Sequence, residues 1–118
     1  MANGVNIGDY IDGTEVTWAQ MSYSNTAAKN CIANEPKEDK VLKEIEKTAQ
    51  LIIQPCIERF GSIHISSGYR GPELNAAVGG ASASQHCKGQ AVDFWITRKE
   101  KYVSDYINLY MKIVILIN

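Results

Sequence analysis

The stretch SQHCKGQAVDFWI (residues 84–96) passes from a polar, glycine-containing loop into a short strand. Val92, Phe94 and Ile96 recur at a period of two, which is typical of a strand that buries one of its faces. Asp93 lies between them in sequence and therefore belongs to the opposite face. The segment predicts a strand whose less apolar side carries a carboxylate.

His86 and Asp93 stand seven residues apart, with Gly89 between them. Glycine adopts the backbone angles of a tight turn, so the loop can fold back over the strand and bring the imidazole near the carboxylate. Both groups are zinc ligands. An isolated histidine and aspartate at this spacing are more often a solvated histidine and a locally bonded aspartate, so these two residues alone are a weak motif.

Two further segments predict how this strand packs. Isoleucines alternate with polar residues over Ser62–Ser66, which indicates a second strand. Apolar residues recur every three or four positions over Asn34–Phe60, which indicates one long helix with an apolar face. The order of these segments shows no alternating βαβ units. It predicts an α+β fold in which the long helix and short helices pack on a small antiparallel sheet that contains Ser62–Ser66 and Ala91–Ile96.

Prolines mark the limits of the helices. Pro36 suits the first turn of the long helix, while Pro55 lacks a backbone donor and predicts a kink or a tightened last turn before Gly61. A short helix is expected over Gly71–Val78, with Pro72 at its first turn.

The two ends of the chain are less regular. Residues 1–20 show no sustained period and are expected to form an irregular arm. Apolar residues at helical spacing predict a last helix from about Lys99 to Met111, and the β-branched run that begins at Ile113 favours a terminal strand or an extension of that helix. Residues 1–118 together are expected to form one domain.

Composition narrows the class of partner. Lys and Arg total 12 and Asp and Glu total 13, for a net charge of -1, so we expect a small or neutral ligand and neither nucleic acid nor an anionic membrane surface. Cys31, Cys56 and Cys87 are odd in number and form no C-x-x-C motif, which favours reduced thiols over disulfides or a cysteine-based zinc site.

Targeting signals are not visible in the sequence. Met1–Asp12 contains no basic segment followed by an apolar run, so we expect synthesis in the cytoplasm without a secretory signal. The longest apolar run, Ile113–Ile117, is much shorter than the roughly 20 residues that cross a bilayer, so membrane insertion is not expected.

Three motifs occur in order around the His-Asp pair. Residues 67–70 read Ser-Gly-Tyr-Arg, residues 74–80 read Leu-Asn-Ala-Ala-Val-Gly-Gly, and residues 84–93 fit Ser-x-His-x-x-Gly-x-Ala-x-Asp. Together they resemble the zinc D-Ala-D-Ala carboxypeptidases and dipeptidases of the hedgehog-like D,D-peptidase group, in its small single-domain branch. The resemblance covers roughly Met21 to Trp95, and several ordered motifs are more specific than any single one.

The resemblance implies a D,D-peptidase-like fold and a zinc ion held by His86, Asp93 and a second histidine, with a water that a glutamate activates. It implies that Arg70 stabilises charge on the substrate carbonyl and that Ser84 bonds the dipeptide end of the substrate. The implied substrate is a peptidoglycan stem peptide or the D-Ala-D-Ala dipeptide. A cellular or prophage enzyme of this kind would act on the cell wall after release.

In the family the second histidine and the glutamate come from a late strand, and residues 111–118 depart from that pattern, as a truncated or divergent end would. Glu100, His64 and Cys87 are the remaining candidate groups, and we assign no catalytic residue. The sequence leaves three interpretations open. They are a zinc D,D-carboxypeptidase or endopeptidase domain for D-alanyl peptide bonds, either active or inactive as it stands, a non-catalytic peptide-binding module or pseudoenzyme, and a site completed by a second subunit.

Overall fold

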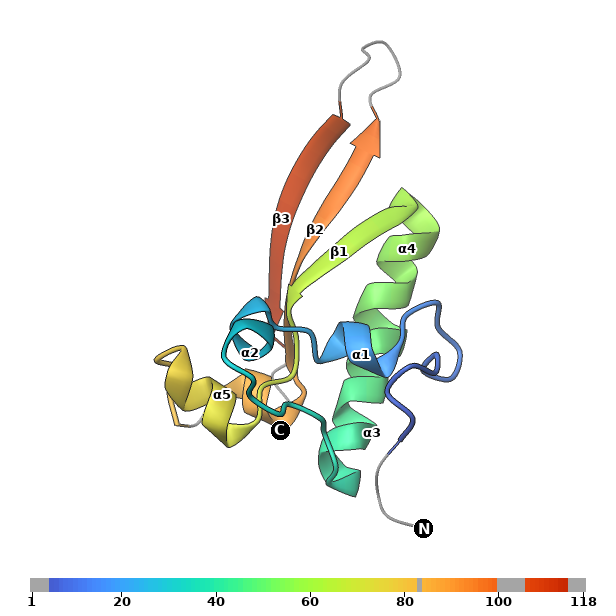
Figure 1. Cartoon of the computed structure of the whole chain (residues 1–118). Coiled ribbons are helices and arrows are strands. Elements are labelled where there is room, and N and C mark those ends of the chain that lie inside the picture. The colour runs from blue at the N-terminus through green and yellow to red at the C-terminus, as the bar shows by residue number, and fades with distance from the viewer. Residues whose placement is uncertain (1–4, 83, 100–105, 115–118) are drawn as a thin grey trace.

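The sheet consists of β1 (Ser62–Ser67), β2 (Ala91–Lys99) and β3 (Tyr106–Val114), in the order β1-β2-β3 with both neighbouring pairs antiparallel. The computed structural model describes residues 5–82, 84–99 and 106–114. A long helical rod lies alongside the sheet, and small helices gather near one end of it (Figure 1). The prediction of an α+β fold with a small antiparallel sheet is confirmed.

The rod contains α3 (Asp39–Thr48), a π-helical turn (Ala49–Ile53) and α4 (Gln54–Phe60). It starts at Asp39, five residues after the predicted start at Asn34, whose side chain instead bonds backbone groups elsewhere in the fold. The helix itself and its packing on the sheet are as predicted.

The π-helical turn lies just before Pro55, where the sequence predicted an irregularity. The Gln54 amide donates to the carbonyl of Ala49, five residues back, instead of to the carbonyl four residues back. Proline has no N–H for the next rung of the ladder, so a wider turn before it costs fewer hydrogen bonds than it would elsewhere. The rod continues through this turn as one body (Figure 1).

The core lies between the rod and one face of the sheet. Phe94, Val92 and Ile96 are at most 2% exposed and all lie on that face of β2. The side chains that cover them come from the rod, from β1 and from the N-terminal segment, namely Leu42, Ile45, Ala49, Ile53, Ile65, Ile11, Val16, Trp18 and Met21. Because Asp93 alternates with Val92 and Phe94, it lies on the face away from the core.

The N-terminal segment contributes more to the core than an irregular arm would. Most of residues 5–16 form neither helix nor strand, as expected, but Ile11 and Val16 are buried and Tyr10 forms a bridge with Thr17. Thr17 then caps the short helix α1 (Trp18–Met21). Scattered apolar residues gave no period here, yet they fill the core.

The other small helices are α2 (Asn25–Lys29) and α5 (Pro72–Ala77), and a 3-10 helix spans Gln85–Lys88. Helix α5 confirms the short helix predicted over Gly71–Val78.

The predicted last helix from Lys99 to Met111 is wrong. Strand β2 extends to Lys99, and Tyr106–Val114 pairs with it as β3, with Phe94 opposite Met111 and Val92 opposite Ile113. The segment alternates apolar and other residues, Ile107, Leu109, Met111 and Ile113, and this period of two fits a strand better than the helical spacing. The predicted terminal strand from Ile113 is the end of β3. Residues 100–105 lie outside the described part.

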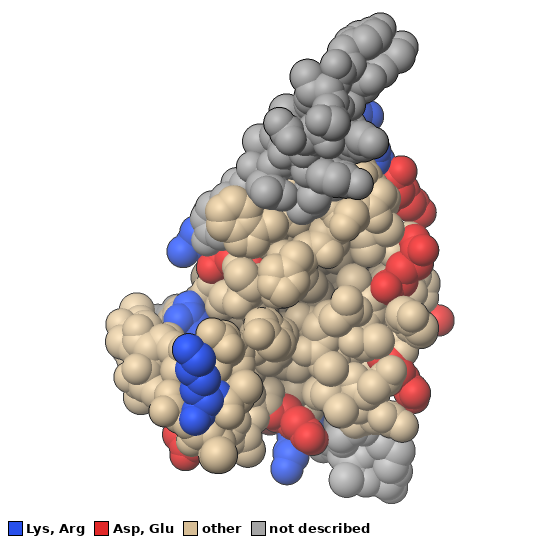
Figure 2. Space-filling model, turned by 45° about the horizontal axis from the view of Figure 1, so that its top comes forward, with Lys and Arg blue, Asp and Glu red and all other residues tan. Residues whose placement is uncertain are grey.

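Within the described ranges, no helix combines the length and apolar character that crossing a membrane requires. The face drawn in Figure 2 carries charges of both signs, with acidic side chains along one edge and uncharged residues across the centre.

Candidate metal centre

His86 is held in place by its own short helix. The Ser84 hydroxyl accepts a hydrogen bond from the His86 amide at 3.2 Å, and Gly89 ends the turn with a positive φ of 74°. A Cβ at Gly89 would also press on Ile45 of α3, so glycine is needed there for both conformation and space. The imidazole is buried, at 4% exposure.

The orientation of the imidazole is fixed by a backbone carbonyl. The Nδ1 atom of His86 lies 2.8 Å from the oxygen of Gly68. A carbonyl can only accept, so Nδ1 carries the proton and the lone pair of a neutral ring is on Nε2. Metal-binding histidines commonly have such a partner on the nitrogen that does not bind the metal.

The Nε2 atom of His86 faces Asp93. It lies 3.6 Å from Oδ2 of Asp93, which is too far for a strong hydrogen bond. Burial, the largest effect, lowers the pKa of His86, with Arg70 and Lys112 adding to it, while the Gly68 carbonyl and Asp93 oppose it. The ring is therefore neutral at pH 7, and two lone pairs face each other across the gap.

Such a gap suits a cation. Two ligand atoms on a tetrahedral zinc are about 3.4 Å apart when each lies about 2.1 Å from the metal. The Oδ1 atom of Asp93 is buried and has no hydrogen-bond partner among the described residues, which leaves that carboxylate short of a positive or donor group. The His86 and Asp93 side chains thus fit two positions of a zinc site.

The pairing of β1 with β2 is irregular beside Asp93. The pairing of β1 with β2 shifts between Ile65 and Ser67, and the hydroxyl of the intervening Ser66 donates to the Asp93 carbonyl at 3.2 Å. Bulges of this kind redirect side chains and recur beside functional sites.

Arg70 is held near His86 by a backbone hydrogen bond and by a side-chain contact with Ser84. Its amide donates to the His86 carbonyl at 3.1 Å, and its Nη2 contacts the Ser84 hydroxyl at 3.4 Å. Arg70 Nε is buried and lacks a hydrogen-bond partner within the described part of the chain. The structure therefore brings together all four residues that the sequence singled out, His86, Asp93, Arg70 and Ser84. Their roles as ligands and substrate contacts stay predictions.

Asn34, the predicted start of the long helix, instead holds the segment that carries Arg70. Its Nδ2 donates to the carbonyls of Ser22 and Tyr69, each at 2.9 Å, and its Oδ1 accepts from the Gly71 amide at 2.7 Å. No local pattern reveals this role, because its partners lie 12 to 37 residues away along the chain.

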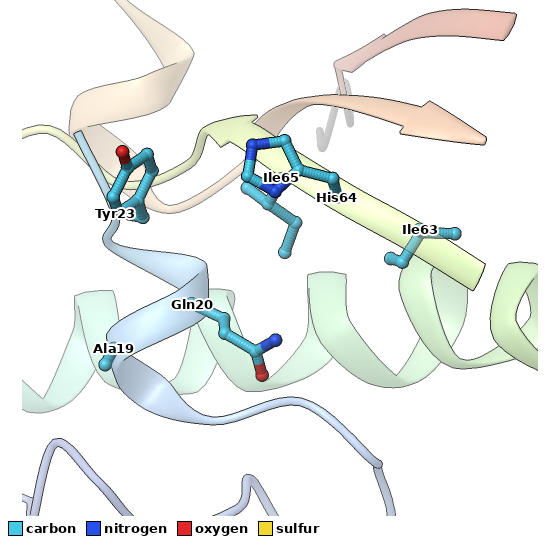
Figure 3. A pocket seen from close by; sticks show the side chains of 6 residues that line it. All are labelled: Ala19, Gln20, Tyr23, Ile63, His64 and Ile65. Carbon is cyan, nitrogen blue, oxygen red and sulfur yellow. The ribbon is translucent and has the colours of Figure 1, made fainter. Parts of the chain in front are cut away.

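The other candidate ligands lie elsewhere or outside the described part. His64 projects from β1 toward Tyr23, with ring centroids 6.1 Å apart, beside a small pocket (Figure 3). Cys87 lines a different pocket of about 550 Å³ with Tyr69 and Gln85. Glu100 is not among the described residues. Within the described ranges no group of three His, Cys, Asp or Glu side chains converges on a metal position.

The α+β domain thus holds a buried, oriented histidine that faces an aspartate, with an arginine beside them. A family model described as Peptidase M15 matches residues 14–108, so the chain belongs to the peptidase M15 family. This membership confirms the resemblance to the zinc D-Ala-D-Ala carboxypeptidases and assigns the chain to a group of metallopeptidases. Comparisons with curated proteins and with solved structures gave no match.

Proposed function

We propose that this chain is a zinc-binding domain that acts on D-alanyl peptide bonds of peptidoglycan stem peptides. His86 and Asp93 serve as metal ligands, and Arg70 and Ser84 contact the substrate. The observation that carries the proposal is the 3.6 Å gap between His86 Nε2 and Asp93 Oδ2, with the lone pair of a neutral imidazole turned toward the carboxylate. Membership of the peptidase M15 family supports zinc as the cation.

A bound zinc would polarise the substrate carbonyl and lower the pKa of a bound water. Arg70 supplies a multidonor cation beside His86 and Ser84, and a guanidinium of this kind can bond an oxygen of the substrate. Ser84, already bonded to the His86 amide and close to Arg70, supplies a hydroxyl for the end of the peptide. The hedgehog-like D,D-peptidase fold and action on the cell wall after release are part of the same proposal.

A second candidate is a module that binds the stem peptide without cleaving it. It is favoured by the convergence of only two metal-ligating side chains within the described residues, whereas catalytic zinc normally takes three protein ligands. This candidate keeps Arg70 and Ser84 as peptide contacts and needs no general base.

Zinc binding and turnover of the full chain separate these candidates. Zinc affinity is measured by competition with a chromophoric chelator, and D-alanine release from a synthetic stem pentapeptide is measured on the zinc-loaded protein. Replacing either ligand, His86→Ala or Asp93→Asn, is expected to weaken zinc binding by about two orders of magnitude. If zinc affinity is the same in both variants as in the parent, the pair is not a metal site.

Peptide binding is measured in parallel by calorimetry. Arg70→Lys keeps the charge but loses the planar guanidinium that can donate two parallel hydrogen bonds. We therefore expect it to weaken peptide binding about tenfold with zinc affinity unchanged. Peptide binding without D-alanine release would favour the non-catalytic module. Release that disappears in His86→Ala would favour the peptidase.

A further inference from the structure

Lys112 stands directly across from Asp93. The two residues are paired in the register of β2 and β3, so their side chains emerge on the same face of the sheet. Side chains of directly opposed residues have Cβ atoms about 4.5–5.5 Å apart, well within the reach of a lysine. Lys112 is exposed and Asp93 half-buried, so the flexible ammonium can approach the carboxylate from solvent.

Two cations flank the His86–Asp93 pair from different elements. Arg70 approaches from the segment after β1, where it bonds the His86 carbonyl, and Lys112 approaches from β3. Both act on the imidazole, since each helps to lower the pKa of His86. The pair therefore lies in a field that opposes a further positive charge.

We propose that Lys112 sets the zinc affinity of this site, as a tethered cation whose charge opposes the metal beside the Asp93 carboxylate. The inference rests on the proposed function, because it takes His86 and Asp93 as the zinc ligands. A divalent ion between these side chains meets the positive charge of the lysine, which opposes its binding. Zinc binding by the parent chain is consequently weak and strongly dependent on residue 112.

The test is a zinc titration of the full chain at low ionic strength, with the metal alone as the probe. Lys112→Met removes the charge and keeps a long side chain, and Lys112→Thr removes the charge with a shorter residue that favours strands. We expect both to tighten zinc binding about three- to tenfold, with a smaller gain at high salt. Lys43→Met is the matched control, because Lys43 is an exposed lysine on α3. Its effect should stay below about twofold.

Lys112→Glu extends the test, since it places a carboxylate opposite Asp93 and supplies a third zinc ligand. It should tighten binding by more than about tenfold. Circular dichroism and thermal unfolding establish that each variant is folded.

The outcomes separate this inference from the proposed function. If zinc binds the parent chain and His86→Ala abolishes binding, but the Lys112 variants match Lys43→Met, the role of Lys112 is wrong and the metal site stands. If zinc binds no variant, Lys112→Glu included, the metal site and the role of Lys112 both fail. Tighter binding in Lys112→Met and Lys112→Thr, lost when His86→Ala is added, supports both.

Discussion

The Nδ1 atom of His86 donates to the carbonyl oxygen of Gly68 at 2.8 Å, across 18 residues of sequence. This contact links two of the three motifs, the Ser-Gly-Tyr-Arg segment and the loop before β2. It exists because the backbone at Gly68 passes directly under the carbonyl of Met21, where any side chain would collide. Glycine at this position allows the close approach to Met21, and its carbonyl leaves Nε2 of His86 as the nitrogen that can bind a metal.

Gly68→Ala should destabilise the domain by about 2–4 kcal/mol, because the new Cβ overlaps the backbone of Met21 and the segment must move. Urea denaturation measures the loss, and zinc titration should show weaker binding in the same variant. Gly8→Ala is the control, since a Cβ there meets only Asn6 Oδ1 at 3.6 Å. An unchanged denaturation midpoint for Gly68→Ala would show that the close approach to Met21 does not exist.

The free energy of unfolding of the metal-free domain should fall at acidic pH because of His86. Burial, the largest cause, holds the pKa of His86 below its ordinary value of 6.5 in the folded state. The unfolded chain therefore takes up the proton first, and the free energy of unfolding falls as pH drops below about 6.5 toward the folded pKa. Urea denaturation between about pH 7.5 and about pH 5.5 measures this dependence.

His86→Gln isolates the contribution of this residue, because it removes the titrating group and keeps a polar side chain. The variant should lose less stability than the parent over the same pH interval. Equal losses in the two proteins would mean that His86 is not held neutral by the fold.

The sequence predicted the sheet and the rod where the periodic signal was strong. Ser62–Ser67 and the start of β2 alternate clearly, and the rod has a continuous apolar face. The error over Lys99–Met111 arose because Tyr106–Val114 contains apolar residues that satisfy a helical and a strand period at once. Pairing with β2, a non-local contact, decides between them.

In the site, too, the residues in local motifs could be predicted, whereas a residue placed by strand pairing could not. The motifs identified His86, Asp93, Arg70 and Ser84, since family patterns record the residue types that the chemistry needs. They could not reveal Lys112, whose position opposite Asp93 depends on a strand that the sequence assigned to a helix.

Asn34→Ala should destabilise the domain by about 1–3 kcal/mol and displace Arg70. The variant leaves the carbonyls of Ser22 and Tyr69 and the amide of Gly71 without their partner. Chemical denaturation measures the first effect, and the loss of stem-peptide affinity in calorimetry measures the second. Asn30→Ala is the matched control, because Asn30 makes one exposed bond to Thr26 and should change stability by less than about 0.5 kcal/mol. Equal effects of the two variants would contradict the role of Asn34.

Thr48 joins α3 to the turn that positions His86, and Thr48→Val tests that link. Its hydroxyl is buried and lies 2.8 Å from the Gly89 carbonyl and 2.9 Å from the Glu44 carbonyl. Valine keeps the shape but removes the donor, so we expect a loss of about 1–2 kcal/mol in the free energy of unfolding, measured by urea denaturation. Thr48→Ser keeps the hydroxyl and removes only a methyl group, so it should cost about half as much. A larger loss for serine than for valine would show that packing, and not the bond to Gly89, fixes the turn on α3.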